Sequence, residues 1–303
     1  MNFDLLKQII EKNSKDLNKD FKRLFHGRGD YYEGFSFLTI DSIDTILNIA
    51  FYKEISIEDE NIIIDILKEF ISTSRHTTIN LQRRYLSKAP SELIVGKLDD
   101  DLYAIEDSIK FILDLKSYQN NGYFPDMKNG RAYIKSIAKD KNVLNLFSYT
   151  CGFSLSASVA DAKNVYNIDM SKGALTKGRS NHHLNNISTH NIDFGPYNIL
   201  KSFSKIRKKA PYDIIIIDPP TFQKGSFEAT KDYIKIIRRL EEIVNPNCTI
   251  LACLNSPFLD EDFLIDLFKE HCPTFKYEKR LQNCEEFKCK DEQNSLKNLV
   301  FKN

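Results

Sequence analysis

Residues 214–227 read IIIIDPPTFQKGSF, an apolar run that stops abruptly at an aspartate followed by two prolines. Four consecutive isoleucines without polar alternation are typical of a strand that is buried on both faces of a parallel sheet. Proline cannot donate a hydrogen bond to a neighbouring strand, so Pro219 and Pro220 end the strand at once. Asp218 is therefore predicted at the carboxyl edge of a central strand, where open α/β sheets bind their ligands.

The second half of the chain alternates strand-like and helix-like segments. A helical sequence follows each of the strand-like stretches, which lie at 141–148, 164–171, 189–195, 212–218 and 248–255. This alternation predicts an α/β fold in which a parallel sheet carries helices on both faces.

The first 120 residues follow a different pattern and predict a smaller α+β domain. Residues 3–24 have the apolar spacing of an amphipathic helix, and the sequence around 35–55 is rich in β-branched and aromatic residues. Ser56 and the acids after it predict a capped helix over 56–72. Residues 93–98 and 102–116 are predicted to pair as a hairpin. The expected boundaries are thus 1–120 for this domain and 121–303 for the catalytic domain.

Charge and cysteine usage limit the classes of protein to consider. The chain has 303 residues and a net charge of +1, but residues 1–120 hold 16 basic and 21 acidic side chains, which leaves 27 basic and 21 acidic ones for the rest. If a polyanion binds, the second half is the better surface, although an ordinary solvated surface accounts for the same charge. Six widely separated cysteines and a charged amphipathic start predict a cytoplasmic protein without a membrane segment or signal peptide.

Polar residues at the predicted strand ends are the candidates for ligand binding. Asp169 ends the second strand of the series, where an acid typically accepts hydrogen bonds from ribose hydroxyls, although it could instead cap the next helix. The first loop, FSYTCGFS (147–154), lacks the G-x-G-x-x-G pattern that cradles a pyrophosphate. A nucleoside cofactor without phosphates fits this loop better, which favours S-adenosylmethionine over NAD or ATP.

The segment after the isoleucine run is the candidate catalytic element. Asp218 and the carbonyl groups of the following prolines, Pro219 among them, can hold a flat group that bears an amine. Phe222 can stack on the face of such a group, as nucleobases require. A simple strand stop with a satisfied aspartate is the alternative.

The motifs that carry a family resemblance lie between residues 119 and 257. They are QNNGYFPDMKNGR (119–131), VLNLFSYTCGFSLSA (143–157), NIDMSKGAL (167–175), NIDF (191–194), IIDPPTFQKGSF (216–227), KDY (231–233) and LACLNSP (251–257). With these motifs the chain resembles class I S-adenosylmethionine-dependent methyltransferases, and among them the bacterial 23S ribosomal RNA enzymes that modify cytosine C5 or guanine N7. The resemblance implies a Rossmann-like catalytic domain. Residues 1–120 resemble a branch with a shortened N-terminal unit that has no clear RNA-binding PUA domain.

The resemblance also implies roles for single residues. Asp169 would hold the ribose, and Asp218 would lie near the transferred methyl group and the target base. The other residues implied in cofactor binding are Tyr149, Thr150, Cys151 and Gly152 under the methionine part, Met170, Asp193 and Phe194 around the adenine, and Phe124, Asp126 and Arg131 on the N-terminal side of the pocket. From the residues alone, Asp193 could equally be a loop aspartate that bonds its own backbone.

The positions of the cysteines help to predict which atom of the base accepts the methyl group. Methylation of cytosine C5 needs a cysteine nucleophile, and in the C5 enzymes that the chain resembles this cysteine follows the strand after D-P-P. Asn255 occupies that position here, and Cys253 lies two residues earlier on a predicted buried strand. We therefore expect transfer to a nitrogen, with guanine N7 favoured over an exocyclic amine. A C5 RNA enzyme, a methyltransferase for a small molecule or protein, and a non-catalytic cofactor-binding protein remain alternatives.

Partners follow from the remaining charges. Lys224 and Lys231, close to the expected catalytic edge, are predicted to contact RNA phosphates, with 23S ribosomal RNA as the expected partner. Cys248 and Cys253 fall on opposite faces of one strand, so no metal site is expected. His182 and His183 are expected on a solvated helix surface. The sequence leaves the oligomeric state open.

Overall fold

The computed structural model describes residues 1–116, 120–220, 222–223 and 227–303, with only the backbone of 222 and 223. The chain forms two compact units. The first comprises Met1–Pro125 together with Cys284–Asp291, and the second comprises Asp126–Asn283 together with Glu292–Asn303. Within the described residues, no helix is both long enough and apolar enough to cross a membrane.

The described part of the second unit contains a seven-stranded, mostly parallel sheet. Its spatial order is β10-β9-β8-β11-β14-β16-β15. The strands are β8 (Asn142–Leu146), β9 (Asn164–Asp169), β10 (Ile192–Pro196), β11 (Tyr212–Ile217), β14 (Val244–Leu254), β15 (Lys276–Leu281) and β16 (Lys297–Lys302). β16 runs antiparallel to both of its neighbours, and the other neighbouring strands of this sheet pair in parallel. The predicted parallel α/β sheet is confirmed, and the antiparallel edge adds to it.

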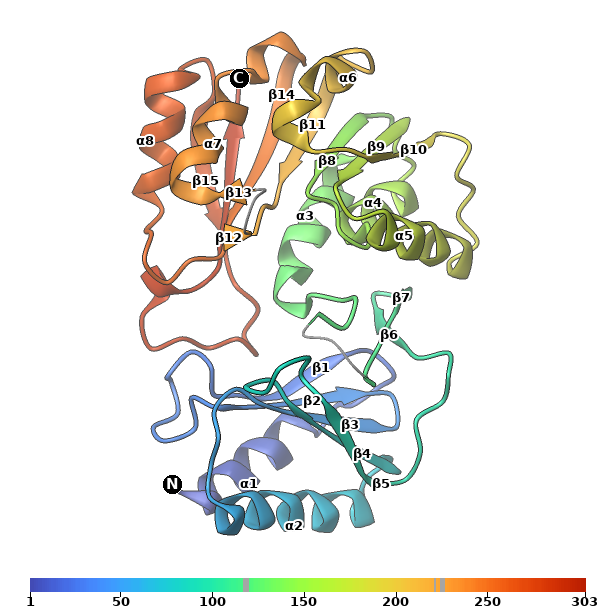
Figure 1. Ribbon diagram of the computed structural model, residues 1–303, viewed down its shortest axis with the longest axis vertical. Helices are drawn as coiled ribbons and strands as arrows, with labels where there is room; N and C mark the ends of the chain where they lie inside the picture. Colours follow the sequence, from blue (N-terminus) through green and yellow to red (C-terminus); the bar gives the residue numbers. More distant parts are fainter. Residues whose placement is uncertain (117–119, 221, 224–226) are drawn as a thin grey trace. The chain divides into compact units, whose positions relative to one another are not determined.

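Helices cover both faces of this sheet, as expected. The helices are α3 (Lys128–Ile137), α4 (Gly152–Val159), α5 (Lys172–Leu184), α6 (Phe203–Arg207), α7 (Ala229–Ile237) and α8 (Asp262–His271), with 3₁₀ turns at Pro125–Met127, Ile199–Lys201, Leu240–Glu242 and Glu292–Asn294. Apolar residues of α6, α7 and α8 pack on one face, and those of α3 and α4 pack on the other (Figure 1). A short antiparallel pair, β12 (Phe222–Gln223) and β13 (Phe227–Glu228), precedes α7.

The strand order creates a switch point beside β8. The chain leaves β8 toward β9 and β10 on one side, and then returns to form β11 on the other side. Helices that leave β8 and β11 therefore lie on opposite faces, so a crevice opens at the carboxyl ends of these strands. Asp169 and Asp218, two of the acids predicted to bind ligands, lie at this edge.

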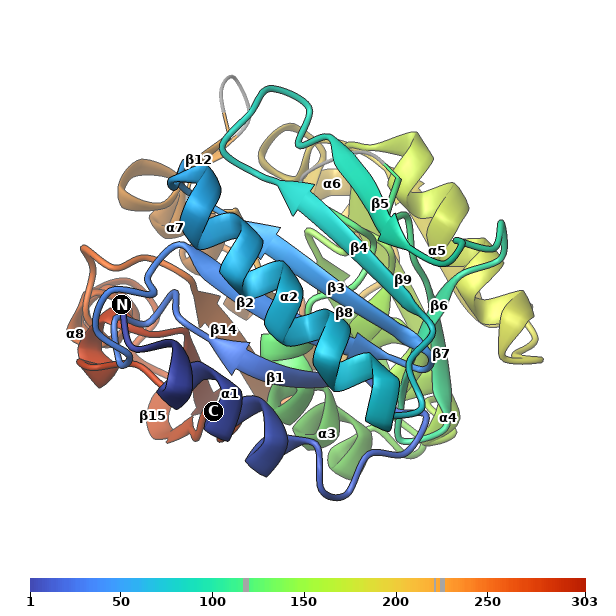
Figure 2. The same cartoon turned by 90° about the horizontal axis from the view of Figure 1, so that it is seen from below.

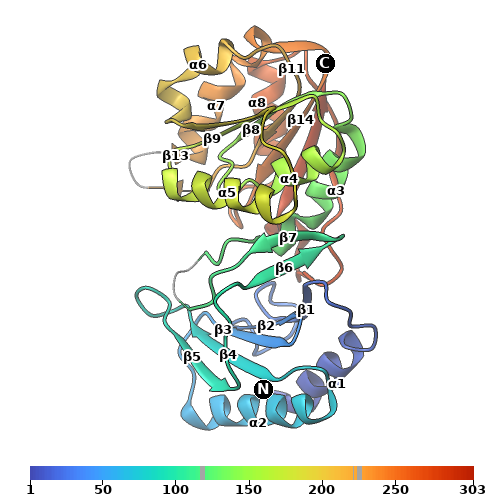
Figure 3. The ribbon, with the colours of Figure 1, turned by 90° about the vertical axis from the view of Figure 1, so that its right-hand side faces the viewer.

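The first unit is built on a five-stranded sheet with helices on one face. Its sheet has the order β1 (Lys22–His26), β2 (Leu38–Ile43), β3 (Ile46–Phe51), β4 (Thr78–Arg83) and β5 (Ser91–Val95). Helices α1 (Phe3–Asn13) and α2 (Ile57–Thr73) lie against one face (Figure 2), and the hairpin β6 (Tyr103–Glu106) with β7 (Ile109–Ile112) lies on the other (Figure 3). Ser56 caps α2 as predicted, because its Oγ accepts the backbone N–H of Asp59 at 3.1 Å.

Two local expectations for this unit were wrong. The helix predicted over 3–24 ends at Asn13, and residues 22–26 form a strand instead, because the apolar residues there pack into the sheet. The predicted hairpin between 93–98 and 102–116 does not form. Residues 91–95 pair with β4, and the hairpin closes within 103–112.

A late segment of the sequence completes the first unit. Within Cys284–Asp291, the ring of Phe287 lies 4.9 Å from the guanidinium carbon of Arg23, and the backbone N–H of Lys290 donates to the carbonyl of Gly29 at 2.8 Å. A Cβ on Gly29 would lie 2.1 Å from the carbonyl oxygen of Lys288, so only glycine permits this close approach.

Candidate active site

The strand register brings Asp169 and Asp218 to one edge of the sheet. Leu146, the last residue of β8, is level with Ile168 on one side and with Ile217 on the other. Each acid directly follows one of these isoleucines. Because adjacent strands lie about 5 Å apart, the two backbone positions are separated by about 10 Å, with the end of β8 between them.

Asp169 anchors the loop that follows β8. Its carboxylate accepts the backbone N–H of Tyr149 at 2.9 Å through Oδ2, and that of Ser171 at 2.8 Å through Oδ1. The cap of α5 is Ser171, whose Oγ accepts from the backbone N–H of Ala174 at 3.1 Å. Asp169 therefore does not cap the helix. Each carboxylate oxygen can accept a second hydrogen bond, which leaves capacity for the two hydroxyl groups of a ribose.

The loop itself has an unusual backbone. Phe147, Tyr149 and Cys151 all have positive φ angles, of 58°, 45° and 65°. Such conformations are costly for residues other than glycine and persist only where surrounding contacts hold them, often at ligand sites. One of these contacts is the side-chain amide of Asn181, which donates to the carbonyl of Thr150 at 3.0 Å.

Cys151 is a packing residue in this loop. Its side chain is fully buried, and burial raises the pKa of its thiol to about 12. Helix α5 approaches it closely, because a Cβ on Gly178 would lie 2.5 Å from the cysteine Sγ. Within the predicted cofactor-binding loop, Tyr149 to Gly152, the side chain of Cys151 therefore faces the protein interior.

A buried chain of polar groups supports the same loop from below. Asn145 donates to Asn167 at 2.9 Å, Asn167 donates to Ser154 at 3.0 Å, and Ser154 lies 3.0 Å from Nε2 of His182. Nδ1 of His182 lies 2.7 Å from the carbonyl of Gly178 and must carry the proton, so Nε2 accepts from the serine hydroxyl.

The expectation that His182 is solvated was wrong. Its side chain is fully buried, and burial lowers its pKa from 6.5 to about 4, so it stays neutral at physiological pH. Only His183, the next residue, is exposed. The helical pattern could not distinguish the two residues, because the polar partners of His182 come from other elements.

Asp218 lies in an electrostatically unusual position. The pKa of its carboxyl group is raised from 3.8 to about 7, first by burial and then by the charge of Asp126, while the charge of Arg131 acts in the opposite direction. Arg131 is buried on α3. The charges of Asp126 and Arg131, which are far from Asp218 in the sequence, thus act on its carboxyl group.

Cys253 lies under this acid and is not exposed. It is 1% exposed and packs between the sheet and α3 and α4. Burial and the nearby charge of Asp218 raise the pKa of its thiol well above the ordinary value. The hydroxyl of Tyr233 lies 3.0 Å from the carbonyl of Ile217 and 2.8 Å from that of Cys253, and so ties the ends of β11 and β14 together.

The expected position of Asp193 was wrong. β10 continues to Pro196, which is level with Asp169, whereas Asp193 is level with Tyr166 in the middle of the strand. Its carboxylate pairs with the ammonium group of Lys209 at 2.8 Å, and both side chains are about half exposed. Asp193 is therefore not a strand-end acid.

Phe194 likewise lies away from the strand ends. Its ring packs edge-on against His182 at 5.6 Å, and the guanidinium of Arg179 covers it at 4.1 Å. The residue beside Met170 is Asn198, whose side-chain nitrogen lies 3.4 Å from the methionine sulfur. Met170 is 48% exposed at the edge of the sheet. Sequence reasoning missed Asn198, which could have been found as the first polar residue after the true end of β10.

The remaining predicted residues vary in how far the structure describes them. Pro219 is buried, and Phe124, which is exposed, belongs to the first unit. Lys231 is exposed on α7 and pairs with Glu228 at 2.8 Å. The side chain of Phe222 and the whole of Lys224 lie outside the described residues. No group of three or more metal-binding side chains occurs in the described parts of the chain.

The groups at this edge fit a nucleoside cofactor better than a nucleotide. Asp169 offers carboxylate oxygens to hydroxyl groups, and the exposed thioether of Met170 offers an apolar surface to a flat ring. The strained loop brings backbone atoms to the same edge, and the glycine pattern of a pyrophosphate cradle is missing from its sequence.

Comparisons with known proteins agree with this geometry. The model of a family described as S-adenosylmethionine-dependent methyltransferases matches residues 22–302. The chain is 31% identical over 246 residues to ribosomal RNA large subunit methyltransferase K/L of Pseudoalteromonas translucida, covering 76% of this chain and 32% of that protein. It is 30% identical over 174 residues to ribosomal RNA large subunit methyltransferase I of Cronobacter sakazakii, covering 56% of this chain and 44% of that protein. The chain thus spans less than half the length of either relative.

A solved structure shares the architecture of nearly the whole chain. SMU.776, described as a methyltransferase and solved in complex with SAH, superposes with a TM-score of 0.88 at 25% identity, over 99% of this chain and 81% of that one.

Proposed function

Because the chain belongs to the S-adenosylmethionine-dependent methyltransferase family, we propose that it methylates a base of large-subunit ribosomal RNA at a nitrogen, with guanine N7 favoured. Its cofactor is S-adenosylmethionine, which when bound supplies a methyl group on a positively charged sulfur. The proposal for the substrate rests on the names of two relatives and on the chemistry of the residues around Asp218.

The observation that carries the proposal is the environment of Asp218. Its carboxyl group ends the strand beside the loop that Asp169 anchors, and its pKa is raised to about 7. When a ring nitrogen accepts a methyl group, the base becomes positively charged. A carboxylate held next to the ring favours that charge most strongly in a partly dry site. The nearby Arg131 keeps a fraction of the group ionised at neutral pH.

The state of Cys253 supports nitrogen over cytosine C5 as the acceptor. A C5 enzyme needs a thiolate that can reach the ring, and reactive thiolates have lowered pKa values and partial exposure. Cys253 has the opposite properties, since it is 1% exposed and the pKa of its thiol is raised. Transfer to a nitrogen lone pair requires only alignment, to which positioning by Asp218 contributes.

The experiment that tests the proposal is direct methyl transfer. Purified protein, labelled S-adenosylmethionine and ribosomal RNA from cells that lack this protein would be incubated, and the nucleosides would then be separated by mass spectrometry. We expect one new methylated nucleoside, 7-methylguanosine, and no 5-methylcytidine. RNA from cells that contain the protein is the matched control, because its site should already be modified.

Three outcomes would contradict the proposal in different ways. Incorporation into 5-methylcytidine would overturn the nitrogen acceptor. Incorporation only into protein or small molecules would overturn the RNA substrate. Calorimetric binding of S-adenosylmethionine without transfer to any of these would contradict the proposed substrate and acceptor together.

A further inference from the structure

Phe258 is the most exposed of the large apolar side chains in the described residues. It is 91% exposed, whereas Ser256, two residues earlier in the segment after β14, is 2% exposed. Singly exposed apolar side chains are common on protein surfaces and by themselves indicate no function. The contacts around it therefore decide whether this ring is incidental.

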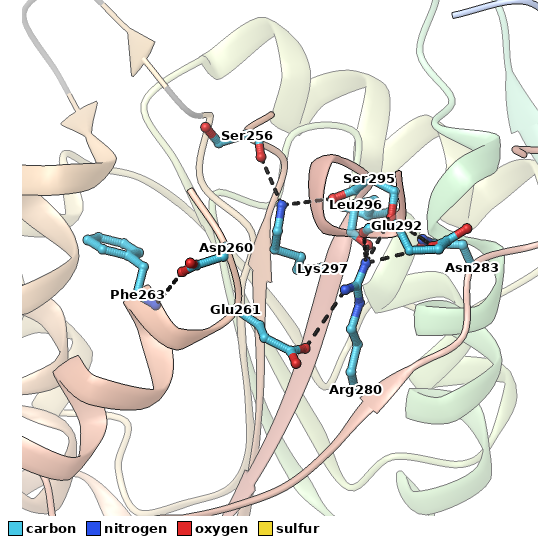
Figure 4. Close-up of polar contacts among 10 residues, drawn as sticks. All are labelled: Ser256, Asp260, Glu261, Phe263, Arg280, Asn283, Glu292, Ser295, Leu296 and Lys297. Carbon is cyan, nitrogen blue, oxygen red and sulfur yellow. Dashed lines mark hydrogen bonds and ion pairs between the residues drawn. The ribbon is translucent and has the colours of Figure 1, made fainter. Parts of the chain in front are cut away.

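The chain before Phe258 is fixed by a buried lysine. Lys297 is fully buried, and its ammonium group donates to the carbonyl of Ser256 at 2.8 Å and to that of Ser295 at 3.0 Å (Figure 4). Ser256 is itself 2% exposed, and its Oγ accepts the backbone N–H of Phe258 at 3.2 Å. Burying an ammonium group is unfavourable unless its hydrogen bonds are satisfied, so these contacts define one loop position closely.

Arg280 fixes the segment that directly precedes Lys297. The guanidinium of Arg280 donates to the carbonyls of Glu292 at 2.8 Å and Leu296 at 3.1 Å, and to the hydroxyl of Ser295 at 2.8 Å. Asn283 donates to the same hydroxyl at 2.8 Å. Figure 4 shows this cluster next to the loop after β14.

The chain after Phe258 is fixed as well. Asp260 accepts the backbone N–H of Phe263 at 3.2 Å and so holds the start of α8. Glu261 lies 3.8 Å from Arg280, which connects the two ends of the loop through one guanidinium. The loop is thus held at Ser256 and again at Asp260, with the phenyl ring of Phe258 exposed between them.

The loop also begins at the reactive edge of the sheet. β14 is next to β11, and Ala252 is level with Ile217, the residue before Asp218. A fully extended chain rises about 3.5 Å per residue, so Phe258 lies within about 17 Å of Cys253. Cys253 in turn is near Asp218, whose charge raises the pKa of the cysteine thiol. This reach covers a target base and the nucleotides beside it.

We propose that Phe258 is a stacking platform for a nucleobase that flanks the methylated one, and that Lys297 is a positioning residue that holds this platform. This inference rests on the proposed RNA substrate. Aromatic side chains on rigid supports bind single-stranded bases through their faces, with little dependence on the identity of the base. Phe258 therefore contributes to RNA affinity, and the methyl transfer step itself does not need it.

The test measures methyl transfer to ribosomal RNA by Phe258→Ala, Phe258→Leu and Phe258→Tyr. Loss of a stacked base costs about 5- to 100-fold in affinity, so we expect KM for RNA to rise by that factor in the alanine variant, with kcat within about twofold of wild type. The leucine variant keeps apolar area without a π face and should stay weak. The tyrosine variant should restore the wild-type KM. The Kd for S-adenosylmethionine, measured by calorimetry, should not change in any of them.

Val159→Ala is the matched control. Val159 is 43% exposed and ends α4, whose N-terminus begins at the carboxyl end of β8, so this residue lies toward the opposite edge of the sheet. It should leave KM unchanged. The positioning role is tested by Lys297→Met, which should raise KM in the same way and speed hydrogen exchange at residues 255–260.

The outcomes separate this inference from the function on which it rests. If the wild type methylates RNA and Phe258→Ala has the same KM as Val159→Ala, the platform is overturned and the proposed function stands. If leucine rescues as well as tyrosine, simple apolar contact replaces stacking, which also overturns it. If the wild type transfers no methyl group to any RNA, the proposed function fails first and the platform fails with it.

Discussion

Replacing Asp218 with asparagine should lower the methyl transfer activity and should raise the stability relative to the wild type as the pH rises. The folded protein holds the proton of this carboxyl group up to about pH 7, whereas an ordinary aspartate releases it near pH 3.8. Raising the pH through this window therefore lowers the free energy of unfolding of the wild type, since a charge must be accommodated where it is only partly hydrated and close to the charge of Asp126. Asparagine has no such charge, so Asp218→Asn should become relatively more stable as the pH rises.

The magnitude follows from the two pKa values. Between pH 5 and pH 8 the wild type should lose about 2 to 3 kcal/mol of unfolding free energy relative to the variant. Hydrogen exchange of the amides of β11 and β14 reports the stability of this unit without requiring the whole chain to unfold in one step.

Activity should follow the ionised fraction of the same group. Single-turnover methyl transfer by the wild type should rise about tenfold between pH 6 and pH 8, and the asparagine variant should be slower by about 100-fold or more with no such rise. Cofactor affinity should be nearly unchanged, because Asp169 supplies the carboxylate for the ribose. Asp161→Asn, at an exposed acid near the start of β9, is the control and should match the wild type.

Two results would refute this reasoning. A variant that loses stability at pH 8 would mean that the Asp218 charge is favourable in the folded state. A pH-independent wild-type rate, with cofactor binding and transfer lost together in the variant, would move Asp218 from the acceptor to the cofactor.

Three further changes have defined outcomes. Asp169→Ala should raise the Kd for S-adenosylmethionine, measured by calorimetry, more than 100-fold. It should also speed hydrogen exchange at the amides of Tyr149 and Ser171, because both lose their acceptor. A near-normal affinity would exclude the ribose role of Asp169. Cys253→Ser should keep transfer within about twofold of wild type, since the thiol is buried and protonated, and an inactive folded variant would restore the C5 mechanism. The free energy of unfolding of His182→Gln should depend less on pH than that of the wild type. Acidification from pH 7 to pH 5 should lower it by about 2 kcal/mol more in the wild type than in the variant, because the folded pKa of about 4 lies below the ordinary 6.5. Equal pH dependence of hydrogen exchange in β9 would show that His182 is already protonated or exposed.

The parts of the site that the sequence predicted are those encoded locally. Asp218 follows a long apolar strand and precedes two prolines, and Asp169 follows another such strand, so both edge positions could be read from neighbouring residues. Asp193 was misplaced because its strand continues through Gly195 to Pro196, although these residues normally end strands. Pairing with β9, which lies elsewhere in the sequence, outweighed the local signal.

Other features could not have been predicted because their partners are distant. Residues 297–302 carry two lysines and an asparagine, yet β16 is almost wholly buried between β14 and β15. The ammonium group of Lys297 donates there to the carbonyl groups of Ser256 and Ser295, which offsets the cost of its burial. The burial of His182 depends in the same way on Ser154, which comes from another helix.

The placement of Cys284–Asp291 within the first unit has a consequence for how the protein is made. Domains commonly fold in order as they leave the ribosome, with the N-terminal one first. Here the contacts of Arg23 and Gly29 with Phe287 and Lys290 can form only after nearly all of the catalytic sheet has been translated. A nascent chain stalled after residue 125 would leave this surface uncovered, so we expect the first unit to reach its full protease resistance only late in synthesis.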